Sequence, residues 1–176
     1  LATGDRNVLP YLKYKCDALT AIQIRHPDEK GPWPEVVSLG QMGGWRHNFY
    51  GGAGYGTMPA IGVPAVLGYH LSKEAGVPYN ALGYARAVQW FFHNGAQVGY
   101  IPYGYCDEPR TVRKPIDTDK LASGMLWPGN GSTAGAAILY DLLGNKKISR
   151  INSHVSTHSY KNTGYAHGGH FWINLY

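Results

Sequence analysis

Three short turns of similar sequence constrain the fold of this chain more than any other feature. Each carries a glycine at the end of an apolar segment, at Gly4, Gly76 and Gly144, and these glycines lie 72 and 68 residues apart. A glycine at the end of an apolar segment is typical of a left-handed helix cap. The recurrence therefore predicts pairs of helices, joined by tight turns and repeated along the chain.

Apolar residues at steps of three and four predict the helices that flank these turns. In the first helix the series consists of Leu9, Leu12, Cys16, Leu19 and Ile22. In the third it consists of Leu82, Ala85, Val88, Gln89 and Phe92. The predicted helices cover residues 7–25, 57–75, 81–93, 134–143 and 146–159.

Individual residues mark the ends and the contacts of these helices. Asn80 is expected to cap the third helix, and Ser132 or Thr133 the fourth, because their side chains accept hydrogen bonds from first-turn N–H groups. Gly62 and Gly68 within the second helix predict close approach of another helix, because glycine has no side chain to hold a neighbour away.

The helices before the turns are apolar and the helices after them are more amphipathic, which favours an inner and an outer layer. We expect an all-α chain of helix-hairpin repeats belonging to an α/α toroid. Two to three hairpins do not close a ring, so residues 1–176 are expected to form a single segment of a larger toroid, within a longer chain or completed by self-association. An open helical domain is the alternative.

Glycine-rich loops precede the apolar helices. Residues 40–56 contain seven glycines among seventeen residues, together with Trp, Phe and two Tyr. Disordered glycine tracts lack such aromatics, so we expect an ordered loop whose backbone passes close to something, which makes it a candidate ligand loop. Residues 129–135 and 164–169 are similar, and in a toroid all three loops would collect at one mouth.

An ordered set of motifs along nearly the whole chain resembles a known family. The motifs are Leu1-Ala-Thr-Gly-Asp5, Gly43-Gly-Trp45, Tyr50-Gly-Gly-Ala-Gly-Tyr-Gly56, Ile101-Pro-Tyr-Gly104, Asn130-Gly131, Ala137-Ile-Leu-Tyr-Asp-Leu-Leu-Gly144 and Gly164-Tyr-Ala-His-Gly-Gly-His-Phe-Trp172. They resemble the bacterial family called domain of unknown function 6288. The resemblance implies a toroid core like that of terpenoid cyclases and prenyltransferases, within exported proteins, and it assigns no catalytic residue. The family usually has a His-Thr-Gly-Asn type of run where this chain has His167-Gly-Gly-His170, so His170 departs from the pattern.

Composition narrows the function classes. The formal charge is +5, and the basic residues are scattered along the chain, whereas a nucleic-acid binder concentrates them on one face. We therefore expect no nucleic-acid partner. No apolar run has the length of a membrane span. Cys16 and Cys106 form no CxxC pair, and Cys16 fits a helix core, although a disulfide between the two stays open.

The candidate binding residues lie in the glycine-rich loops. Aromatic rings beside Arg, Asn and His suit a glycan or another polar polymer, or a small polar ligand. The expected ligand-binding residues are Trp45, Arg46, His47, Asn48, Tyr50, Asn130, His167 and His170. A carbohydrate lyase on this fold would use Tyr, His and Arg to remove a proton beside a carboxylate, and its candidates are Arg46, His47, Tyr103 and His167.

Metal and cofactor chemistry has less support. His154, His158, His167 and His170 lie within seventeen residues, which makes them metal-ligand candidates, but no HExxH motif and no nearby acid accompanies them. No nucleotide-binding fingerprint is present, and no cofactor is expected. A glycosidase would need two carboxylates, for which Asp107, Glu108 and Asp141 are the candidates.

Three functions follow from these observations. The first is a module that binds a polar polymer, glycan or peptide, at the mouth formed by the glycine-rich loops. The second is a carbohydrate-active enzyme with lyase-like chemistry. The third is a structural repeat protein that assembles with itself or with the remainder of its own chain.

Overall fold

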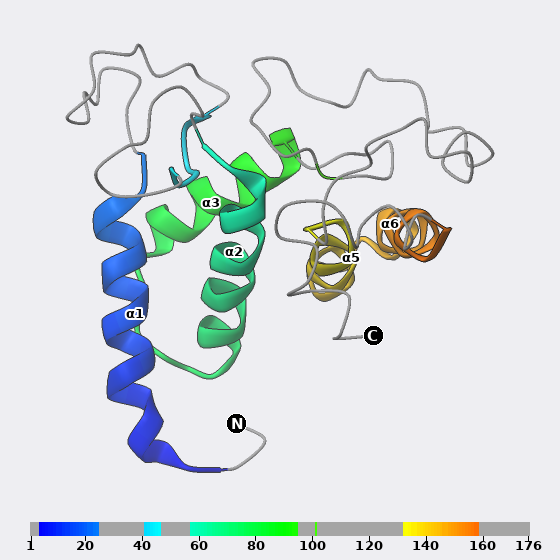
Figure 1. Ribbon diagram of the computed structural model, residues 1–176. Coiled ribbons are helices and arrows are strands. Elements are labelled where there is room, and N and C mark those ends of the chain that lie inside the picture. The colour runs from blue at the N-terminus through cyan, green and yellow to red at the C-terminus, as the bar shows by residue number, and fades with distance from the viewer. Residues whose placement is uncertain (1–3, 25–40, 47–56, 95–100, 102–131, 159–176) are drawn as a thin grey trace.

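The protein is mostly helical in its computed structural model, which describes residues 4–24, 41–46, 57–94, 101 and 132–158. A short 3₁₀ helix, η1 (Arg6–Val8), leads directly into α1 (Leu9–Ile22) (Figure 1). The other helices are α2 (Pro59–Glu74), α3 (Ala81–Asn94), α5 (Ser132–Leu142) and α6 (Lys146–His158). The predicted all-α class is confirmed for the described residues, in which the only β pairing is an isolated bridge.

The three turn glycines adopt the same left-handed conformation, with φ of +66° at Gly4, +73° at Gly76 and +82° at Gly144. After α2, the N–H of Gly76 donates to the Lys73 carbonyl and that of Val77 to the Ser72 carbonyl. After α5, the corresponding donors are Gly144, to Asp141, and Asn145, to Tyr140. Both turns are therefore Schellman motifs, in which glycine avoids the Cβ clash of the left-handed region.

Asx side chains cap the helices that follow these turns. The Asn80 carboxamide oxygen accepts the Gly83 N–H at 2.7 Å, as predicted for α3. Asn145 accepts the Ile148 N–H in the same way at the start of α6. For α5, Thr133 lies inside the helix, and its hydroxyl accepts the Ile101 N–H at 3.1 Å. The alternative cap, Ser132, stays a prediction, because its side chain lies outside the described part of the structure.

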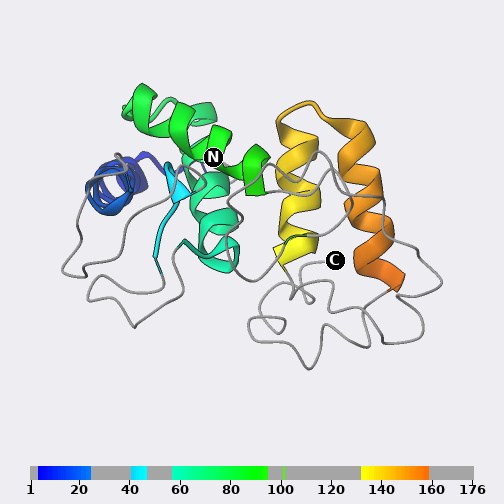
Figure 2. The same cartoon turned by 90° about the horizontal axis from the view of Figure 1, so that it is seen from above.

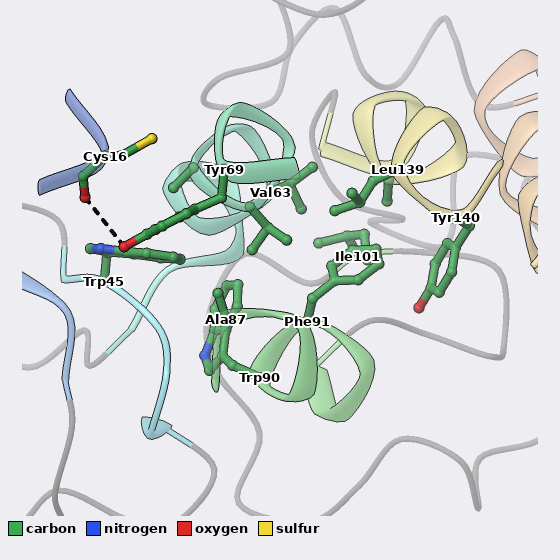
Figure 3. Packing of buried hydrophobic residues seen from close by; sticks show 13 residues of the cluster. Cys16, Trp45, Val63, Tyr69, Ala87, Trp90, Phe91, Ile101, Leu139 and Tyr140 are labelled. Atoms are coloured by element: carbon green, nitrogen blue, oxygen red, sulfur yellow. Dashed lines mark hydrogen bonds between the residues drawn. The ribbon is translucent and has the colours of Figure 1, made fainter. Parts of the chain in front are cut away.

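One hydrophobic core joins α1, α2, α3 and α5 (Figure 3). Its largest fully buried side chains belong to Trp45, Trp90, Tyr69, Tyr140 and Phe91. Phe91 of α3 packs against Tyr140 of α5 with ring centroids 4.5 Å apart. The five largest fully buried side chains of the core are thus aromatic.

The apolar and amphipathic helices differ as predicted for one hairpin. In α5, Ala134, Ala136, Leu139 and Tyr140 are all buried, whereas α6 buries only one side. Figure 2 shows α5 and α6 side by side, while α1 is seen end-on. In Figure 1, α1 and α2 are seen from the side and α5 and α6 are seen nearly end-on. The α5–α6 pair therefore runs across the direction of α1 and α2.

The predicted apolar series is largely displaced in α3 and mostly confirmed in α1. The side of α3 that faces the core consists of Gly83, Ala87, Trp90, Phe91 and Asn94, whereas Leu82 of the predicted series is 59% exposed. The wide aromatic rings of Trp90 and Phe91 decide which side of α3 is buried. In α1, Cys16 is buried as predicted, but Ile22 is 47% exposed.

The predicted close approach of another helix is confirmed at only one of the two glycines of α2, Gly62 and Gly68. A methyl group on Gly62 would overlap the Trp90 ring, so the predicted close approach is confirmed there. Nothing lies within 4 Å of the corresponding position on Gly68, so the prediction is wrong for that residue.

Cys16 is a free, buried thiol. No helix in the described part of the chain has the length and apolar character of a membrane span.

Two buried tyrosines differ in whether their hydroxyl group has a hydrogen-bond partner among the described residues, so their substitution by phenylalanine should have opposite effects on stability. The Tyr69 hydroxyl hydrogen-bonds Thr20 and donates to the Cys16 carbonyl at 3.3 Å, whereas the Tyr140 hydroxyl has no partner in the described structure. We expect Tyr69→Phe to lower the free energy of unfolding by about 1–2 kcal/mol, because two partners lose their bond. Tyr140→Phe is expected to raise it by about 1 kcal/mol, because an unsatisfied buried hydroxyl is removed. Urea unfolding of both variants measures the difference.

Tyr69 and Tyr140 also make the stability of the folded protein depend on pH. Burial raises the pKa of Tyr140 well above its ordinary value, and burial also raises the pKa of Tyr69. The unfolded chain loses phenolic protons near pH 10 while the folded protein retains them, so stability is complete below about pH 10 and falls as the pH rises further. Tyr140→Phe should unfold at a higher pH than the unmodified protein. An unchanged alkaline midpoint would contradict the burial of this hydroxyl.

Candidate functional site

The root of the first glycine-rich loop is held by backbone hydrogen bonds to α1 and α2. The Gly43 N–H donates to the Ile24 carbonyl at 2.7 Å, and the Ile24 N–H donates to the Gly44 carbonyl at 3.1 Å. The Met58 N–H donates to the Trp45 carbonyl at 2.9 Å. Residues 41–46 therefore form a strap between the C-terminal end of α1 and the N-terminal end of α2, which we call the loop root.

Glycines in the loop root are required by the approach of α3. A methyl group on Gly43 would lie 2.6 Å from the carbonyl carbon of Arg86, and φ of Gly43 is +88°. A methyl group on Gly44 would lie 2.9 Å from the Thr57 side chain and would overlap the Trp90 indole. At these two positions the backbone passes close to α3 and to Thr57. The prediction of an ordered loop over residues 40–56 is not tested, because residues 47–56 lie outside the described residues.

Gln23 ties the loop root to α1 and α3. Its side-chain amide donates to the carbonyls of Gly43 and Gly83, both at 2.9 Å. The side chain is almost fully buried, and its carbonyl oxygen has no partner among the described residues. A buried amide with two backbone acceptors fixes the positions of the segments that it joins.

Trp45 lies in the core rather than on a surface. Its side chain is 1% exposed, and its indole N–H donates to the Leu19 carbonyl at 2.9 Å. The indole meets that of Trp90 edge-to-face at 6.2 Å and lies beside Tyr69, as Figure 3 shows. Trp45 therefore packs the loop root against the helices, and its ring is not available for stacking on a ligand in this arrangement.

Arg46, another predicted binding residue, lies at the C-terminal end of the loop root. It is partly exposed and forms an antiparallel bridge with Thr57, and this bridge brings together the two ends of residues 47–56. Thr57 is itself buried, and its hydroxyl accepts the Trp90 indole N–H at 3.1 Å. The start of the loop is thus fixed to the core within one residue of Arg46.

The remaining predicted binding and catalytic residues lie outside the described residues. They are His47, Asn48, Tyr50, Tyr103, Asn130, His167 and His170. The carboxylates Asp107 and Glu108 lie outside them too, whereas Asp141 is exposed and pairs with Lys146 at 2.7 Å. The joint role of these residues in binding or catalysis stays a prediction.

Of the four histidines predicted as metal ligands, two lie in a described helix. His154 is exposed on α6, and the same helix includes His158 at the predicted spacing of four residues. Within the described ranges, no three His, Cys, Asp or Glu side chains gather as metal ligands.

A histidine–tyrosine pair that the sequence analysis did not single out joins α2 to α3. Nδ1 of His70 and the Tyr84 hydroxyl share a hydrogen bond at 2.8 Å, and their rings stack with centroids 6.2 Å apart. Tyr79 meets Tyr84 edge-to-face at 5.7 Å. The lone histidine in the apolar second helix was the signal that could have pointed to this contact.

The charges beside this pair lie in solvent. The Lys73 ammonium bonds the Glu74 carboxylate at 3.0 Å and lowers the pKa of Glu74, whereas burial raises the pKa of Tyr84. His70 is 7% exposed, which leaves a substrate little access to its ring. The pair therefore serves as a joint between two helices rather than as a reaction centre.

Comparisons with known proteins give one match. A family model described as domain of unknown function (DUF6288) matches residues 1–176. No curated protein and no solved structure matches the chain significantly.

Proposed function

The chain belongs to the DUF6288 family along its whole length, and from this premise we propose that it is a module that binds a polar polymer, glycan or peptide, at the side of the fold where its glycine-rich loops begin. The family has no assigned activity, so the proposal depends on the residues of this chain. As further parts of the proposal, the protein is bacterial and exported, which the family resemblance suggests.

The observation that carries the proposal is the rigid loop root. Three backbone hydrogen bonds and one bridge anchor residues 41–46 beside the ends of α1 and α2, and Gln23 adds one bond to α3. Binding residues work best on loops that a rigid scaffold positions, because less conformational entropy is lost when the ligand binds. Arg46 and the loop residues that follow it start from such a scaffold.

We also propose that the helices form part of an α/α toroid. The two identical Schellman turns and the apolar–amphipathic pairing of α5 with α6 support it. The α5–α6 pair lies across α1 and α2, whereas the hairpins of a closed ring stand side by side. An experimental structure of a longer chain that contains these residues tests the proposal, and a crossing that persists there would reject the toroid.

Arg46 provides the test of polymer binding. We expect Arg46→Ala to weaken binding of a bound polymer about tenfold, because a guanidinium hydrogen bond to a polar ligand is lost. Polygalacturonate, dextran and an unfolded peptide are suitable probes for isothermal titration calorimetry. Arg150→Ala is the matched control, since Arg150 is exposed on α6 and does not belong to the loop root.

The outcomes separate the proposed functions. Equal losses in Arg46→Ala and Arg150→Ala would contradict a site at the loop root. Absence of binding to all three probes would reject the polymer-binding proposal. Depolymerisation of polygalacturonate with formation of unsaturated ends would instead support the lyase alternative.

A further inference from the structure

Helix α1 has a second apolar side, which no other part of the described structure covers, in addition to the side that enters the core. Cys16 is buried against α2, with Leu19 packed beside the core. Tyr11 and Tyr14 are 59% and 64% exposed, which is unusual for rings of this size. Because residues three apart lie on neighbouring positions of a helix surface, the two rings form one exposed aromatic patch.

Lys15 belongs to this patch. Its ammonium lies 5.0 Å from the centre of the Tyr11 ring and 5.6 Å from the centre of the Tyr14 ring. Such distances are those of cation–π contacts, which hold the charge beside the ring faces. One cation and two rings therefore share a single surface, which we call the tyrosine patch.

The charge of this surface is positive. Lys13 on the same helix is neutralised by Asp17 at 2.6 Å. No carboxylate in the described part of the chain pairs with Lys15. An occupant that carries a negative charge would supply the missing counter-charge, while its apolar face would cover the rings.

We propose that Tyr11, Tyr14 and Lys15 bind a carboxylated glycan. The C–H groups on one face of a sugar ring are weakly positive and pack on the negative face of an aromatic ring. A carboxylate on the same sugar would pair with the Lys15 ammonium. A polyuronate presents both groups in one repeating unit. The Cα atoms of Tyr11 and Tyr14 are separated by about 4.5 Å along the helix axis, the rise of three residues.

Other occupants fit less well. Nucleic-acid affinity comes mainly from several phosphate contacts, whereas this patch offers the single cation of Lys15. A packed helix would lie along the whole exposed side of α1 and would therefore cover Ile22, which is 47% exposed. Ile22 thus distinguishes a glycan on the tyrosine patch from a second copy of the chain packed along α1.

This site is separate from the loop root. The tyrosine patch lies in the N-terminal half of α1, whereas the loop root meets the C-terminal end of the same helix. The inference does not require the polymer-binding proposal for the loop root, and Arg46→Ala serves to separate the two.

Binding of polygalacturonate, measured by titration calorimetry, tests the tyrosine patch. The double variant Tyr11→Gln/Tyr14→Gln keeps good helix formers on α1, and we expect it to weaken binding at least about tenfold, because two stacking contacts are lost. Lys15→Gln should weaken binding to polygalacturonate about fivefold and leave binding to its fully methyl-esterified form unchanged, because only the acid pairs with the ammonium. Ile22→Gln should bind as the unmodified protein does, and circular dichroism confirms that each variant is folded.

Several outcomes would overturn the inference. Unchanged affinity of the double variant rejects the patch, and if Arg46→Ala alone abolishes binding, the glycan belongs to the loop root. Tighter binding of single-stranded DNA than of polygalacturonate, lost in the double variant, assigns the patch to nucleic acid. Self-association that both the double variant and Ile22→Gln abolish, measured by analytical ultracentrifugation, assigns this side of α1 to a second copy of the chain.

Discussion

Gly62→Ala is expected to lower the free energy of unfolding by about 3 kcal/mol, because the added methyl group overpacks the contact between α2 and α3. The added methyl would overlap the six-membered ring of Trp90. Trp90 has little room to move, because its indole N–H is bonded to Thr57 and its ring meets Trp45. Chemical denaturation followed by far-ultraviolet circular dichroism measures the loss.

Gly68→Ala is the matched control on the same helix. Its methyl would enter open space, since nothing lies within 4 Å. Alanine restricts the unfolded chain more than glycine does, so this variant should be about 0.5–1 kcal/mol more stable than the unmodified protein. Equal effects of the two substitutions would show that α2 and α3 do not pack through Gly62.

Gly43→Ala is expected to destabilise the protein by about 3 kcal/mol, from two causes that add. The backbone φ of +88° is unfavourable for alanine, and the methyl would meet the Arg86 carbonyl group. That group belongs to the backbone of α3 and cannot turn aside as a side chain would. Thermal unfolding and urea titration both measure the effect.

Gly76→Ala separates the two causes. Gly76 has a similar φ of +73°, but nothing lies within 4 Å of the added methyl. Only the cost of the left-handed conformation remains, so we expect a loss of about 1 kcal/mol. A Gly43→Ala variant no less stable than Gly76→Ala would mean that the loop root does not press against α3.

The helices and their turns could be predicted because local chemistry determines them. A glycine after an apolar run gives the left-handed cap, as at Gly76 and Gly144, and Asn80 caps the helix that follows. These features depend on residues within one turn of each other. Helix ends were placed less well, since α1 stops at Ile22 so that Gln23 can turn its amide toward Gly43 and Gly83.

Contacts between helices could not be predicted in the same way. Gly62 and Gly68 look alike in sequence, but six residues rotate a helix by about 240°, so they face different neighbours. Likewise, tryptophan is a common residue type in binding sites. Only the positions of Trp90 and Tyr69 show that Trp45 is a core residue. The identity of a neighbour distant in sequence decides these roles.

For the candidate site, residue types indicated the chemistry but not the partners. Arg46 was expected near the mouth and lies at the end of the loop root. The His70–Tyr84 contact was missed because it joins two helices at positions fourteen residues apart, across a turn whose path the local pattern does not give.

The clamped loop root has an evolutionary consequence. Ile24 is hydrogen-bonded to Gly43, and Arg46 is paired with Thr57, so the chain before and after each of the two intervening segments is held together. Doubling the length of a flexible connection between fixed ends costs only about 0.6 kcal/mol. Insertions, deletions and whole-loop exchange between these anchor points should therefore leave the helical core almost unaffected. The fold can thus acquire new specificities by exchanging loops, and the same anchor points offer a place to graft foreign segments.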